Sequence, residues 1–112
     1  MWNVDPRILC RKHLLGEHVE CHMFAGSIKK GIKIKGYVDN GLIETHNLKS
    51  RHDLLAEEMV KRGYNHFTPL HFISENVIGK IDSEANIKDL YNRCEECRKN
   101  IIELENKKDT KE

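Results

Sequence analysis

The segment from Lys12 to His22 constrains the fold most strongly, because its residue pattern is typical of an α-helix. Within it, His13, Glu17 and Glu20 follow at spacings i, i+4 and i+7. On a helix these spacings place an imidazole and two carboxylates along one stripe. The leucines between them must face a core at the same time. The segment therefore predicts an amphipathic helix with an ionisable stripe.

The free α-amine of Met1 lies close ahead of this helix in the sequence. An α-amine has a pKa of about 7.7–8.0, against about 10.4 for lysine, so more of it is neutral and nucleophilic near pH 7. A carboxylate beside it could relay protons. Met1 and Glu20 are therefore a candidate nucleophile and proton carrier.

Helical patterns also dominate the rest of the chain. Three main helices are expected: one from Asp5-Pro6 to about Ser27, one capped by Asn47 or Ser50 and ending before Gly63, and one of about 22 residues starting at Asp82 or Ser83. Residues 31–46 are predicted to form a loop with a turn at Asp39-Asn40-Gly41. We expect an all-α single domain over residues 1–105, followed by a frayed polar tail over 106–112.

Composition narrows the class of protein. A chain of 112 residues, 38% hydrophobic and 33% charged, supports one helical domain with one core. No apolar run approaches the roughly 18 residues that span a membrane, and charged residues interrupt any signal pattern at the N-terminus. We expect a cytoplasmic monomer with no membrane partner. The net charge of +1 is weak evidence about other partners.

Four cysteines raise the question of zinc. Cys94 and Cys97 have CxxC spacing, but Cys10 and Cys21 lie on the first expected helix, about 16 Å apart along its axis, and cannot share one site. His18 and His22 are spaced i, i+4 without an HExxH arrangement. Reduced, partly buried thiols are the favoured interpretation, with no metal and no cofactor.

Three stretches resemble one enzyme family. They are His13-Leu14-Leu15-Gly16-Glu17-His18-Val19-Glu20, and the pair Leu48-Lys49-Ser50-Arg51-His52 and Val60-Lys61-Arg62-Gly63-Tyr64-Asn65. The first is similar to the His-Leu-x-(small)-Glu-x-x-Glu segment of the pyrimidine-dimer DNA glycosylases of the phage endonuclease V type. The pair of stretches at 48–52 and 60–65 resembles that family's second helix. Order and separation also fit, and the similarity covers about residues 1–73.

The resemblance implies a compact all-helical enzyme that acts on damaged duplex DNA, at pyrimidine dimers or abasic sites. Such enzymes cleave the glycosidic bond and nick the strand in an AP-lyase step, using the N-terminal amine as a Schiff-base nucleophile. The catalytic carboxylate falls on Glu20 and the helix histidine on His13. Val19 and Met23 stand where family members usually have arginine. Because Trp2 is bulky, Met1 should be retained and supply the amine.

Further residues are candidates for DNA contacts, each with a simpler alternative. His13 could contact a phosphate or sugar, or be a hydrogen-bonded core histidine. Arg51, Lys33 and Lys35 could neutralise phosphates, or be solvated charge. Trp2 could stack in the gap left by an extruded base, or belong to the core.

Glu17 is expected to pair with Arg11 or Lys12 on the helix surface. Two other functions stay open from the sequence. The chain could be a non-catalytic or differently specific DNA-binding relative of the same fold, or a small helical interaction protein.

Overall fold

The computed structural model describes residues 1–64, 68–74 and 76–109, and this part of the chain contains helices and no strand. The α-helices are α1 (Arg11–Lys29), α2 (Lys35–Asp39), α3 (Leu48–Lys61), α4 (Ser83–Arg93) and α5 (Glu95–Asp109). Single 3-10 turns cover Pro6–Ile8 and Thr45–Asn47. The predicted all-α class is confirmed.

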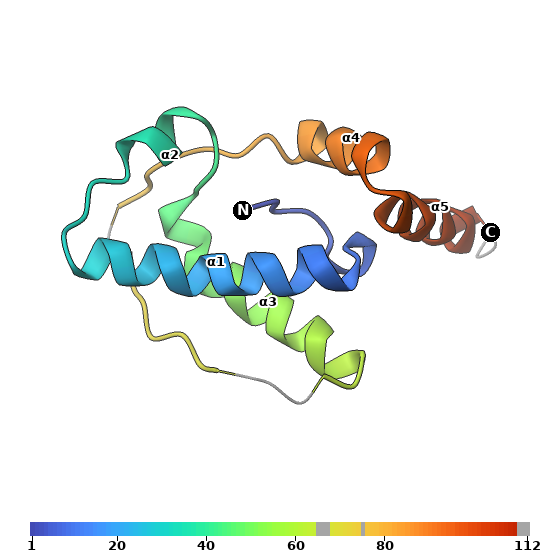
Figure 1. Ribbon diagram of the computed structural model, residues 1–112, viewed down its shortest axis with the longest axis horizontal. Helices are drawn as coiled ribbons and strands as arrows, with labels where there is room; N and C mark the ends of the chain where they lie inside the picture. The colour runs from blue at the N-terminus through green and yellow to red at the C-terminus, as the bar shows by residue number, and fades with distance from the viewer. Residues whose placement is uncertain (65–67, 75, 110–112) are drawn as a thin grey trace.

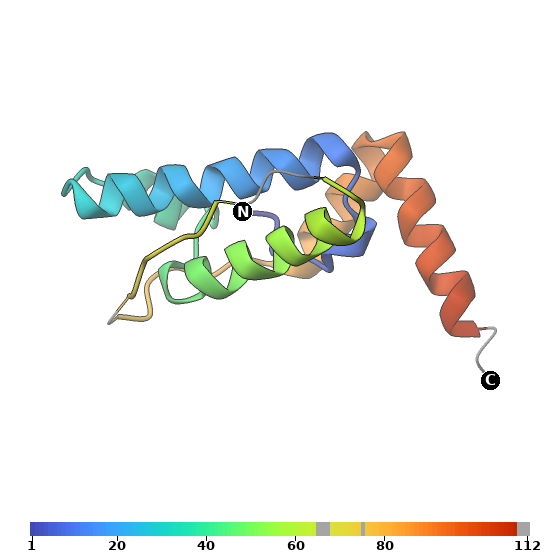
Figure 2. The ribbon, with the colours of Figure 1, turned by 90° about the horizontal axis from the view of Figure 1, so that it is seen from below.

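Helices α1 and α3 form the centre of the molecule and pack against each other (Figures 1 and 2). Their facing sides carry fully buried side chains at helical spacing: Leu14, Cys21 and Phe24 on α1, and Leu48, Leu55 and Met59 on α3. Helices α4 and α5 lie at one end of this pair, and α5 points away from the body (Figure 2). Within the described residues, no helix is both long and apolar enough to cross a bilayer.

The first helix starts later than the sequence suggests. Asp5 does cap a helical turn, because its side chain accepts a hydrogen bond from the Arg7 N–H at 3.0 Å, but this turn is the short 3-10 segment. Leu9 is then extended and fully buried, and the chain changes direction before α1 begins at Arg11. Cys10 therefore occupies the N-cap position of α1.

The expected third helix is divided in two. Cys94 has extended backbone angles (φ −124°, ψ 112°), which end α4 and allow α5 to start in a new direction. The CxxC sequence thus lies at a helix start and not within a continuous helix. Helix α5 continues to Asp109, beyond the boundary expected at residue 105, and residues 110–112 lie outside the described part.

The loops are partly as expected. Helix α3 ends before Gly63, which has φ 84°, as predicted, and the turn at Gly41 has φ 67°. The region 31–46 also contains the short helix α2. Gly79 has φ 88°, and a Cβ there would lie 2.1 Å from the Ile43 carbonyl oxygen. Only glycine fits this crossing, which presses residues 78–81 against the segment leading into α3.

Candidate active site

The Met1 α-amine lies against α1, where it donates hydrogen bonds to Glu20 Oε1 and to the Leu42 carbonyl oxygen, the latter at 2.9 Å. The Met1 side chain is buried in the core, which fixes the amine at this place. The Glu20 side chain is 38% exposed, so its carboxylate meets both the amine and solvent. The structure thus brings together the two groups predicted as nucleophile and proton carrier.

Three successive carbonyls hold the N-terminal segment in place. The Trp2 carbonyl accepts from Asn86 Nδ2 at 2.8 Å, and the Asn3 carbonyl accepts from Ser83 Oγ at 2.7 Å. The Val4 carbonyl accepts from Arg51 Nη1. These donors come from α4 and α3, and the segment runs between α1 and α4 in Figure 1. The amine is therefore positioned by the folded protein and not by a loose chain end.

Glu17 and Arg51 form a buried ion pair beneath this segment. Arg51 Nε donates to Glu17 Oε2 at 2.6 Å and Nη2 donates to Oε1 at 2.8 Å. The residues are 2% and 4% exposed. This corrects two expectations: Glu17 does not pair on the surface, because it shares the buried face of α1 with Leu14, and Arg51 does not present its guanidinium to a phosphate.

Glu44 is a site residue that the sequence analysis missed. Its carboxylate is buried and accepts from the Ile81 N–H at 2.7 Å, from Asn47 Nδ2 at 2.7 Å and from Asn3 Nδ2 at 3.4 Å. Asn3 itself has φ 54°. Glu44 therefore ties the N-terminal segment to the start of α3 and to the segment before α4.

His13 and Trp2 contact each other inside the fold. Their rings meet edge to face with centroids 5.5 Å apart, and the Arg93 guanidinium lies 5.8 Å from the Trp2 ring centroid. Burial, then the charges of Lys12 and Arg93, lower the pKa of His13. These contacts favour the core alternative for both residues over the expected DNA contacts.

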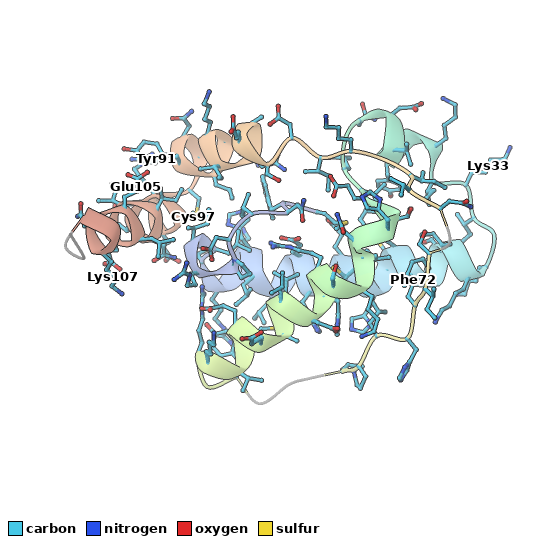
Figure 3. All side chains as sticks on the ribbon, turned by 180° about the vertical axis from the view of Figure 1, so that it is seen from behind. Lys33, Phe72, Tyr91, Cys97, Glu105 and Lys107 are labelled. Atoms are coloured by element: carbon cyan, nitrogen blue, oxygen red, sulfur yellow. The ribbon has the colours of Figure 1, made fainter. Side chains whose placement is uncertain are left out.

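Lys33 and Lys35 are exposed near the C-terminal end of α1. Lys33 points away from the body of the molecule in Figure 3, and Lys35 Nζ lies 2.5 Å from Asp39 Oδ2 within α2. Both are accessible to a phosphate backbone. The motif residue Asn65 lies outside the described residues.

The surface beside the amine is apolar. Val19 and Met23 flank Glu20 on α1 and are 65% and 46% exposed, and Leu42 is also exposed. Val19 and Met23 are the positions at which the family resemblance implies arginine.

Within the described part of the chain, two groups of side chains have ligand atoms close enough to hold a metal ion. His18, His22 and His52 form one group, whose ligand atoms lie within 4.8 Å of one another. Both nitrogens of His52 already have partners, because Nε2 lies 2.8 Å from the Thr68 carbonyl oxygen and Nδ1 lies 2.9 Å from Asp53 Oδ1. A metal here would displace at least one of these contacts.

The second group consists of Cys10, His13, Cys94 and Cys97. Cys10 and Cys21 lie on different sides of α1. Cys21 is buried on the α3 side of α1, and burial raises the pKa of its thiol to about 12, whereas Cys10 turns toward α5. All four cysteines lie in described residues and are free thiols.

A family model described as pyrimidine dimer DNA glycosylase matches residues 1–71, and the chain belongs to this family. No curated protein and no solved structure matches it. The match confirms the family resemblance and indicates a DNA glycosylase type of enzyme with a DNA substrate. It covers the amine, Glu20, Glu17 and Arg51, whereas α4 and α5 lie beyond it.

Proposed function

We propose that this member of the pyrimidine dimer DNA glycosylase family is a glycosylase and AP lyase that acts on pyrimidine dimers or abasic sites in duplex DNA. The Met1 α-amine is the nucleophile and Glu20 is the proton carrier. The observation that supports this proposal most strongly is the contact of the amine with the Glu20 carboxylate and the Leu42 carbonyl oxygen.

The chemistry follows from an amine and a carboxylate in contact. The neutral amine attacks C1′ of the damaged nucleotide, and the electron pair of the C1′–N bond leaves with the base, which takes up a proton. The amine nitrogen then loses its protons as the sugar ring opens, O4′ is protonated and a C1′=N imine forms. In an abasic site the hydroxyl at C1′ leaves as water instead.

Cleavage of the DNA strand requires a proton acceptor next to the imine. The Glu20 carboxylate removes a proton from C2′ of the imine, and the C3′–O bond breaks to release the 3′ phosphate group. Water then hydrolyses the imine and returns the free amine. The partial exposure of Glu20 suits this role, because the carboxylate can reach both the amine and a bound sugar.

Side chains that bond to the N-terminal segment position the amine. Productive attack requires the amine within about 3–3.5 Å of C1′. Arg51, Ser83 and Asn86 fix the three carbonyls that follow Met1, so the amine loses little freedom when substrate binds. We assign these three residues to positioning.

Lys33 and Lys35 remain our candidates for phosphate contacts. Because Val19 and Met23 make the surface next to the amine apolar, we expect the duplex to be held mainly by cations farther from the reacting sugar. The cytoplasmic location and monomeric state stay predictions from the sequence.

Borohydride trapping on duplexes with an abasic site or a thymine dimer tests the proposal. Intact mass first verifies that the chain begins with an unmodified Met1. We expect a reduced covalent adduct whose peptide map places the DNA on Met1. An adduct on a lysine would reject this nucleophile. Salt-dependent duplex binding without an adduct would select the non-catalytic relative, and absence of both would favour an interaction protein.

A further inference from the structure

We propose that Cys10, His13, Cys94 and Cys97 form a structural zinc site that joins the start of α1 to the start of α5. The four residues come from two ends of the chain, and their ligand atoms all lie within 4.8 Å of one another. The proposal concerns a part of the molecule whose α5 half lies beyond the family match, and it is independent of the proposed function.

Three distances between ligand atoms lie within about 0.5 Å of the edges of a tetrahedron around zinc. Zn–S bonds of about 2.3 Å and Zn–N bonds of about 2.0–2.1 Å give edges of about 3.8 Å between two sulfurs and about 3.6 Å between sulfur and nitrogen. The Cys10 and Cys94 sulfurs lie 3.9 Å apart. His13 Nδ1 lies 3.1 Å from Cys10 Sγ and 3.4 Å from Cys97 Sγ.

The backbone presents the ligands in two equivalent pairs. Cys10 is the N-cap of α1 and His13 is three residues later, and Cys94 directly precedes α5 with Cys97 three residues later. In each pair the extended first residue and the first helical turn aim two side chains at one point. Figure 3 shows Cys97 on the side of α5 that faces the N-terminal end of α1.

Backbone groups around the cluster also suit thiolate ligands. The Cys10 backbone N–H donates to Cys97 Sγ at 3.2 Å, and two helix N-termini direct their positive ends toward the cluster. Three thiolates and one neutral imidazole around Zn²⁺ leave a net charge of −1. The pocket next to Cys94 is lined by Lys12 and Arg93 and also by Glu95 and Glu96, so these four side chains add no net charge to it.

Four protein ligands complete a tetrahedron, so this site is structural and leaves no open position for a substrate. Its role follows from its neighbours. His13 packs on Trp2, and α4, which ends at Cys94, carries the two side chains that hold the Trp2 and Asn3 carbonyls. Zinc would therefore fix α4 and α5 against the segment that positions the amine.

Metal binding by the full chain under reducing conditions tests the proposal. After chelation and desalting, the protein is titrated with Zn²⁺ against a chromogenic chelator, and with Co²⁺ to record its absorption spectrum. We expect one metal per chain, with the strong d–d absorption of tetrahedral Co²⁺ and a thiolate charge-transfer band. Zinc should also raise the thermal midpoint, because it binds the folded state.

Two alanine variants separate this site from other thiols. Cys94 is only partly buried, so the Cys94→Ala variant should fold. Its affinity for the metal should fall more than the loss of about 10–100-fold that is typical when a residue supporting a metal ligand is replaced. Cys21→Ala is the matched control and should keep one metal and the same spectrum. Failure of the wild-type chain to bind either metal would overturn the proposal. So would equal affinities in the two variants, or metal loss caused by His22→Ala but not by Cys94→Ala.

Discussion

Glu17 and Glu20 lie three residues apart on α1 and both pair with a cation, but they are held in opposite environments. Glu17 is almost fully buried and accepts two hydrogen bonds from Arg51. Glu20 is partly exposed and contacts the Met1 amine. The Glu17–Arg51 pair is therefore buried, whereas the Glu20 carboxylate can contact a molecule bound at the surface.

The comparison shows how burial assigns different tasks to identical side chains. A buried ion pair is costly to break, because the remaining charge has no solvent, so Glu17 and Arg51 suit a permanent structural contact. In the second pair the Met1 side chain is buried but Glu20 is partly exposed, so the Glu20 carboxylate can exchange protons with a substrate. Glu20 is thus free to react, whereas Glu17 holds the chain that carries the amine.

Replacing Glu20 should give the largest effect on activity. Glu20→Gln removes the proton carrier, and we expect strand cleavage to fall by about 10²–10⁴-fold, as for general acid–base groups. Urea unfolding should change by less than about 1 kcal/mol, because the pair is partly solvated. Single-turnover nicking of an abasic duplex measures the rate, and nicking at the wild-type rate would remove Glu20 from the mechanism.

Replacing Arg51 should instead act on stability. Arg51→Met leaves the Glu17 carboxylate buried without its partner, and we expect a loss of about 3–5 kcal/mol in the free energy of unfolding. The double variant with Glu17→Leu removes both charges and should recover much of that loss. Denaturant unfolding of the single and double variants measures both effects. A single variant as stable as wild type would mean that the ion pair is not buried in solution.

Glu17 and Glu20 also show what can and cannot be predicted from a sequence. The family motif identifies both glutamates, and helical periodicity correctly predicts the class and the extent of α3. Spacing from Leu14 could have placed Glu17 on the buried face, because positions 14, 17, 21 and 24 share it. Pairing with Arg51 could not be predicted, since it depends on how α3 crosses α1.

The cysteines show the same limit at a longer range. Cys10 and His13 have the same spacing as Cys94 and Cys97, and this repeat is visible in the sequence, but the sequence does not show that the two pairs meet. The break between α4 and α5 could not be predicted from the sequence, because the helical pattern of apolar residues continues through it. Tertiary packing of α5 against the Pro6–Ile8 turn decides where that helix begins.

Gly79 allows a test of the loop that contains Leu42, whose carbonyl oxygen accepts a hydrogen bond from the amine. Gly79→Ala places a Cβ against the Ile43 carbonyl at positive φ, and we expect a loss of about 1–3 kcal/mol in stability. The adjoining Leu42 carbonyl should shift with it, so trapping of abasic DNA should fall at temperatures where the variant is still folded. Gly36→Ala, with open space around its Cβ, is the control and should leave trapping unchanged.

The exposed lysines should give the smallest effect. If Lys33 contacts one phosphate, Lys33→Ala should make the slope of log affinity against log salt shallower by about 0.9 and leave stability unchanged. Lys99→Ala, an exposed lysine on α5, is the control. Fluorescence anisotropy with an abasic duplex at several salt concentrations measures both slopes, and equal slopes would place Lys33 away from DNA.

The most direct test of the central claim is to move the amine. A single glycine added before Met1, verified by intact mass, carries the α-amine one residue farther along and so removes its contact with Glu20, while Glu17 and Arg51 keep their ion pair. If the Met1 amine is the nucleophile, the extended chain should remain folded and bind abasic duplex, but the yield of borohydride-trapped adduct should fall by at least about tenfold, because attack requires an approach within about 3–3.5 Å. An undiminished adduct yield from the extended protein would contradict the account.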